Sequence, residues 1–115
     1  MGTPRPEITD LIARYCAQLS AMGIRVDRAI LFGSHARGEA KDGSDIDVLI
    51  VSSDFETLNT RERLEQLGTA AARLWQPIEA RACTPAELAH VEPATLLEEI
   101  LHTGVQVASR RENVG

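Results

Sequence analysis

Two aspartates near a glycine-serine turn are the residues of this sequence best suited to chemistry. Asp45 and Asp47 open an apolar segment, residues 45–51. Residues two apart in a β-strand project from one face with Cα atoms roughly 6.6 Å apart, so both carboxylates can converge on shared cations. Close negative charges raise each other's pKa unless a positive charge intervenes, and the oxygen-binding ion Mg²⁺ supplies that charge. The pair therefore predicts a metal site.

The turn at Gly33 and Ser34 has the features of a phosphate site. It follows an apolar run, so free backbone N–H groups there could point at a phosphate, and Gly33 has no Cβ to obstruct it. The Ser34 hydroxyl can donate a hydrogen bond to a phosphate oxygen. Arg37 could either neutralise phosphate charge or brace the loop through Asp42 or Glu39.

Regular elements must position these residues. Apolar residues at helical spacing from Ile8 to Met22 predict a first helix that ends at Gly23. Residues 26–32 are typical of a mostly buried strand, and residues 45–51 of a central strand whose leading end reaches solvent. Residues 33–44 between these strands, with three glycines and mixed charge, suit a tight turn, one helical turn and a loop.

Further elements follow in the second half. We expect an amphipathic helix over residues 58–74, a strand over 78–83, a short helix from a capping box at 84–87, a helix from Pro93 to Gly104 and an edge strand at 105–107. Trp75 is expected to pack in the core. The apolar residues of the last helix, from Leu96 to Leu101, could cover the sheet or partly face a partner.

This order of elements predicts an α/β (α+β) fold, a mixed sheet of about four strands covered by helices. A chain of 115 residues with 43% apolar content fits one domain, residues 1–115, with a loose tail from about residue 109. Cys16 and Cys83 lack metal-knuckle spacing and are expected to be free thiols.

Net charge and hydropathy limit the classes of partner that the chain is expected to bind. The net charge is −5 and no Lys/Arg-rich run is present, so a nucleic-acid partner is not expected. A triphosphate can still be held through metal ions and backbone amides. No apolar run approaches the roughly 20 residues needed to cross a bilayer. We expect a cytoplasmic protein with a basic or peptide partner.

The sequence GSHARG at 33–38, followed by GSDIDVLIV at 43–51, resembles the signature of the DNA polymerase β nucleotidyltransferase superfamily. It is most similar to the minimal nucleotidyltransferases, small partners of HEPN-domain proteins. The resemblance implies that Gly33 and Ser34 bind the triphosphate, with Arg37 nearby. It also implies that Asp45 and Asp47 hold two Mg²⁺ ions. Alone, the two aspartates could be a solvated exit from a turn; the upstream motif favours the catalytic interpretation.

The family's carboxylate cluster includes a third acid on a later strand. Glu79 is the best candidate, as catalytic residue and metal ligand, because it alternates with inward apolar neighbours on the expected third strand. It departs from the family's usual aspartate. Arg81 should share its face and could instead pair with Glu79 and hold it away from the metal. His35 is expected to be a variable surface position, and His90 and His102 lie on expected helices without ligand spacing, so none of the three is assigned to the site.

The function that the resemblance implies is transfer of a nucleoside monophosphate, AMP from ATP, to a hydroxyl of a protein acceptor. A HEPN toxin is the implied acceptor, with this chain acting as its antitoxin. One alternative is a non-catalytic antitoxin that masks its partner. Another is a small-molecule nucleotidyltransferase of the aminoglycoside type, active as a homodimer.

Overall fold

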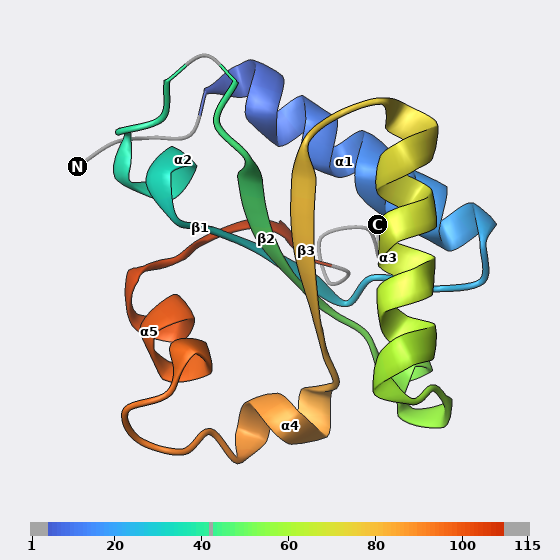
Figure 1. The fold of residues 1–115 in the computed structure, drawn as a ribbon. Coiled ribbons are helices and arrows are strands. Elements are labelled where there is room, and N and C mark those ends of the chain that lie inside the picture. The colour runs from blue at the N-terminus through green and yellow to red at the C-terminus, as the bar shows by residue number, and fades with distance from the viewer. Residues whose placement is uncertain (1–4, 42, 110–115) are drawn as a thin grey trace.

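Within residues 5–41 and 43–109, which the computed structural model describes, four strands form one mixed sheet with helices on both faces (Figure 1). The strand order is β3-β2-β1-β4. The strands are β1 (Arg28–Phe32), β2 (Ile46–Val51), β3 (Ile78–Cys83) and β4 (Val105–Ser109). The pairs β1·β2 and β1·β4 are antiparallel, and β2·β3 is parallel. The predicted α/β fold with a mixed sheet is confirmed.

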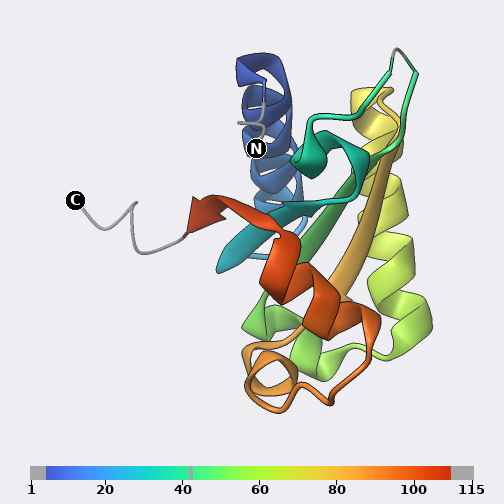
Figure 2. The same ribbon diagram turned by 90° about the vertical axis from the view of Figure 1, so that its left-hand side faces the viewer.

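The helices follow the predicted order, with one short addition, a 3₁₀ helix after β2. They are α1 (Pro6–Ala21), α2 (Ser34–Arg37), the 3₁₀ helix η1 (Ser53–Thr57), α3 (Thr60–Leu74), α4 (Pro85–Ala89) and α5 (Leu96–Thr103). The predicted capping box at Thr84 and Glu87 is present and begins α4, and a second capping box at Asn59 and Glu62 begins α3. Helices α2 and α5 lie on the same side of the molecule, which faces the viewer in Figure 2.

Two apolar regions lie on the two faces of the sheet. On one face, α1 and α3 pack against alternate residues of the strands, among them Ile46, Val48 and Ile50 of β2. Tyr15 of α1 is fully buried there, and its hydroxyl donates a hydrogen bond of 2.8 Å to the Leu67 carbonyl of α3. On the other face, Ile100 of α5 packs with Ile30, Leu49, Val51 and Cys83. The second face also carries the candidate site.

Some predicted details are wrong. Trp75 is 90% exposed rather than buried, because α3 ends at Leu74 and Trp75 takes a left-handed backbone (φ 56°), while Leu74 packs on the core. Strand β2 begins at Ile46, so Asp45 precedes it. Strand β4 extends through Ser109, and the rest of the predicted loose tail, residues 110–115, lies outside the described residues.

Cys16 and Cys83 are free thiols. Ile100 of the last helix covers the sheet, whereas Leu96 and Leu101 remain 40% and 37% exposed. Across the described residues, every helix is too short or too polar to cross a lipid bilayer.

Candidate active site

Strand direction brings the predicted site residues to one end of the sheet. Because β1 and β2 are antiparallel, the end of β1 meets the start of β2, and Phe32 pairs with Asp47. Because β2 and β3 are parallel, their first residues also meet, and Asp47 pairs with Glu79. The turn at Gly33 follows Phe32 directly. Residues 33, 47 and 79 therefore lie at the same end of the sheet.

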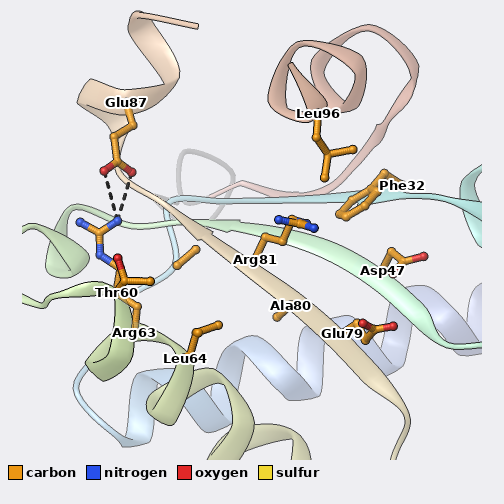
Figure 3. Close-up of a pocket in the computed structure, with 11 residues that line it drawn as sticks. Phe32, Asp47, Thr60, Arg63, Leu64, Glu79, Ala80, Arg81, Glu87 and Leu96 are labelled. Atoms are coloured by element: carbon orange, nitrogen blue, oxygen red, sulfur yellow. Dashed lines mark hydrogen bonds and ion pairs between the residues drawn. The ribbon is translucent and has the colours of Figure 1, made fainter. Parts of the chain in front are cut away.

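The acids also share one face. Ile46 and Ile78 belong to the core under α1 and α3, and side chains alternate along a strand. Asp47 and Glu79 therefore project to the α5 face, where Leu49 and Val51 are packed. Figure 3 shows both carboxylates on this face. The predicted alternation of Glu79 with inward apolar neighbours is confirmed.

Gly33 lies in direct contact with Asp47. Its backbone has φ 75° and ψ −154°, a region that residues other than glycine almost never occupy. A Cβ built on Gly33 would overlap a carboxylate oxygen of Asp47 and lie 3.2 Å from its Cγ. Glycine is thus required twice here, for the backbone and for the space. The glycine turn and the carboxylates form one continuous site.

The pKa values of Asp47 and Glu79 are both raised, in part by the negative charge of Asp45. The pKa of Asp47 is raised above its ordinary value, first by burial and then by the negative charge of Asp45. The pKa of Glu79 is raised first by a hydrogen bond with Asp45, and then by the charges of Asp45 and Asp47. Asp45 is thus close enough to influence both of the others. A divalent cation would remove this repulsion.

The chemistry of these carboxylates fits a hard divalent ion, for which oxygen is the preferred ligand. Among the described residues, no three acidic, histidine or cysteine side chains already surround a common point. Binding of an ion would therefore require rotation of side chains. Asp45, Asp47 and Glu79 are the residues that would hold it.

Of the two roles predicted for Arg37, the structure shows the contact that braces the loop. Its Nε donates a hydrogen bond of 2.8 Å to Glu39, which forms an exposed ion pair. Arg37 therefore braces the turn through Glu39, one of the two predicted partners. The other, Asp42, lies outside the described residues. The charge of Arg37 also reaches Asp47 and lowers its pKa slightly against the raising effects.

His35 is half-buried beside the acids, although a variable surface position was predicted for it. Its ring Nε2 lies 3.4 Å from the carbonyl oxygen of Ser44, immediately before Asp45. Its charge is also the largest influence that lowers the pKa of Asp47. The signal for it was its place inside the GSHARG turn, between Gly33 and Arg37.

Arg81 shares the face of Glu79, as predicted (Figure 3). In the described part of the chain, no ion pair within 4.0 Å joins it to Glu79. Its positive charge lowers the pKa of both Glu79 and Asp47, although other effects outweigh it. The alternative that Arg81 pairs with Glu79 and holds it away is therefore not what the structure shows.

A cavity of about 670 Å³ extends from the acids toward α3. Its lining is Phe32, Asp47, Thr60, Arg63, Leu64, Glu79, Ala80, Arg81, Ala82, Glu87 and Leu96. At its far end, Arg63 of α3 is held by Glu87 of α4, at 3.2 Å from each carboxylate oxygen (Figure 3). The site thus combines an acidic end with a long groove.

Comparison with known proteins identifies the family of the chain. Residues 10–102 match the model of a family described as nucleotidyltransferase domain. A protein of Methanocaldococcus jannaschii named "putative protein adenylyltransferase" is 34% identical over 64 residues. That match covers 55% of this chain and 65% of the relative, which is less than two thirds of the relative's length.

Solved structures share the fold. The crystal structure of a putative nucleotidyltransferase from Sulfolobus solfataricus has a TM-score of 0.66 at 18% identity, over 97% of this chain and 95% of that one. A toxin-antitoxin structure with AMP-PNP has a TM-score of 0.59 at 22% identity, over 86% and 74%. A complex of a tri-AMPylated Shewanella oneidensis HEPN toxin with an MNT antitoxin has a TM-score of 0.52 at 17% identity, over 92% and 73%. At such identities the likeness concerns the fold.

Proposed function

The chain belongs to the nucleotidyltransferase domain family, and from this premise we propose that it transfers AMP from ATP to a hydroxyl group of a protein acceptor. One observation carries the proposal: the Gly33 turn touches the carboxylate of Asp47, and Asp47 pairs with Glu79 on the next strand. A phosphate site and an acidic site are thereby adjacent. The name of the Methanocaldococcus relative supports a protein acceptor.

In the proposed reaction, the acceptor oxygen bonds to the α-phosphorus, the bond to the bridging oxygen breaks, and pyrophosphate leaves. Backbone N–H groups at Gly33 and Ser34, the Ser34 hydroxyl and Arg37 would bind the triphosphate. The hydroxyl proton passes to a carboxylate. Glu79 suits that role by its position, because it lies opposite Asp47 on the strand next to the acceptor side of the site.

Asp45, Asp47 and Glu79 would hold two Mg²⁺ ions, which when bound lower the pKa of the acceptor hydroxyl and neutralise phosphate charge. The part of the protein in the reaction is then positioning and electrostatics. Glu79 has one more methylene than aspartate, so its carboxylate has the length to turn toward Asp47.

We further propose a HEPN-domain toxin as the acceptor and an antitoxin role for this chain, with the reaction in the cytoplasm. Support comes from the likeness of the GSHARG and GSDIDVLIV motifs to minimal nucleotidyltransferases. It also comes from structural neighbours described as toxin-antitoxin complexes, one of them with an AMPylated HEPN toxin.

The test is transfer of label from ATP. The protein is incubated with ATP labelled in the α-phosphate, Mg²⁺ and a HEPN-domain protein as the candidate acceptor. We expect label on the acceptor with wild type and none with Asp47→Ala. Absence of label with both proteins rejects catalysis. If complex formation without nucleotide silences the partner, the chain is a non-catalytic antitoxin; label on an antibiotic or metabolite instead indicates a small-molecule enzyme.

A further inference from the structure

An arginine without an ion pair lies beside the acids, on the side away from the glycine turn. Across the sheet, Gly33 follows β1, Asp47 is on β2 and Glu79 is on β3. Arg81 comes two residues after Glu79 on the same face, with Cα atoms roughly 6.6 Å apart. Its side chain is exposed, and within the described ranges it makes neither an ion pair nor a hydrogen bond.

The order of residues across the sheet gives the reaction a direction, if the proposed function holds. In a phosphoryl-type transfer, the attacking and leaving oxygens lie roughly in line on opposite sides of the phosphorus. With the triphosphate at Gly33 and Ser34, pyrophosphate leaves on the β1 side. The acceptor hydroxyl must then arrive from the β3 side, where Glu79 and the cavity lie.

The cavity has the form of a groove along the free edge of β3. Residues from both faces of this edge strand line it, since Ala80 and Ala82 face α3 while Glu79 and Arg81 face the α5 side. Its volume of about 670 Å³ lies within the usual range for ligand sites, roughly 300–1,000 Å³. An extended segment of another protein therefore has space beside the strand.

The walls of this groove carry apolar side chains and two arginines. Leu64 of α3 and Leu96 of α5 line it and remain 57% and 40% exposed, so they offer apolar contact. Arg63 also lines it, but Glu87 and the carbonyl oxygens of Phe55 and Leu58, each at 3.1 Å, already bind its guanidinium. Arg81 is thus the cation of the groove that can bind a new anion.

We propose that Arg81 binds a carboxylate of the acceptor protein, about two residues from the hydroxyl that receives AMP. In an extended segment, side chains two residues apart have nearly the spacing of Glu79 and Arg81, so the hydroxyl reaches Glu79 when the carboxylate reaches Arg81. A guanidinium binds a carboxylate through two parallel hydrogen bonds, which fixes orientation. Leu64 and Leu96 contact the apolar parts of the segment.

The test uses two peptides that differ at one position. Each carries a tyrosine and a fluorophore. At the position two residues from the tyrosine, one peptide has aspartate and the other has asparagine. Binding to the full chain is measured by fluorescence polarisation in the absence of nucleotide. We expect wild type to bind the aspartate peptide at least about tenfold more tightly, the scale of one charge-assisted hydrogen-bonded contact.

Variants assign the effect to the residue. Arg81→Gln should bind both peptides equally, and Arg81→Lys should retain part of the preference. Arg14→Gln is the matched control, because it removes the same charge from an exposed position of α1, on the opposite face of the sheet. It should retain the full preference. Thermal unfolding of each variant shows that the fold is retained.

Two results overturn the proposal: equal or undetectable binding of the two peptides by wild type, or a loss of ATP affinity in Arg81→Gln, which would mean that Arg81 binds the triphosphate. Transfer of label from ATP is measured separately. Transfer without a preference for the aspartate peptide rejects the role of Arg81 alone. A preference without transfer rejects the catalytic function and leaves the binding groove.

Discussion

Replacement of Gly33 by alanine places a methyl group against the carboxylate of Asp47. The backbone of Gly33 (φ 75°, ψ −154°) is in a region open essentially to glycine alone, and another residue there costs about 1–3 kcal/mol. The new Cβ would also overlap an Asp47 oxygen and lie 3.2 Å from Asp47 Cγ. The carboxylate must move, so the variant should lose both stability and the geometry of the site.

Gly23 separates these two effects. It also has a positive φ, 97°, but a Cβ there would meet nothing within 4 Å. Gly23→Ala should therefore show backbone strain alone. For a domain of 60–100 residues, each kcal/mol lowers Tm by about 4–8 °C, and both variants should show a shift of this order. Displacement of a catalytic group by about 1 Å can cost about 100-fold in rate, and we expect this loss only in Gly33→Ala.

Three measurements decide the matter. Thermal unfolding gives the change in stability, calorimetry gives the Mg²⁺-dependent affinity for ATP, and transfer of labelled AMP gives the activity. They are made on wild type, Gly33→Ala and Gly23→Ala below the lowest Tm. If Gly33→Ala binds ATP and transfers AMP like wild type, the contact with Asp47 has no functional role. Equal loss of activity in both variants would mean that general destabilisation, not the site, is responsible.

Three further variants test separate parts of the structure. The folded-state pKa of Asp47 is raised, so without divalent ions its ionisation opposes folding: stability should fall as pH rises through the interval between its ordinary pKa and the raised value, and Asp47→Asn should reduce this fall in denaturant titrations. Tyr15→Phe removes the 2.8 Å bond to the Leu67 carbonyl and should cost about 0.5–1.5 kcal/mol of unfolding free energy, without a change in ATP affinity, because it lies on the other face of the sheet. Trp75→Gly should raise stability by about 1 kcal/mol, since glycine relieves the left-handed backbone and a 90% exposed side chain has little packing to lose; an unchanged or lower Tm would contradict this.

Local chemistry explains what the sequence made predictable. The helical spacing of apolar residues and the capping residues located the main helices. The capping box at Thr84 and Glu87, for example, satisfies backbone N–H groups at the start of its helix, whatever the helix packs against. The alternation from Ile46 to Val48 fixed which face Asp47 takes, since apolar neighbours must be buried. Such features depend on residues close in sequence.

Features that depend on three-dimensional context were missed. Whether Trp75 packs in the core or projects into solvent depends on how the chain passes from α3 to β3. The left-handed residue at the end of α3 is Trp75 itself and not a glycine, so the sequence does not indicate this turn. The contact of His35 with the loop at Ser44 depends on how that loop returns to β2. The brace between Arg63 and Glu87 joins α3 to α4, residues 24 positions apart. No local pattern specifies these contacts.

The placement of Glu79 shows how a local pattern and a long-range pairing combine. Had β3 run antiparallel to β2, Glu79 would lie at the far end of β2, near Val51, and the site would have two acids. The parallel register, Asp47 opposite Glu79, puts it at the correct end. A slip by one residue would turn Glu79 into the core beneath α3, where an unpaired charge is costly, and would expose Ile78. The burial of Ile78 therefore holds Glu79 beside Asp47. Neither Ile78 nor Glu79, however, indicates from the sequence whether β3 runs parallel to β2.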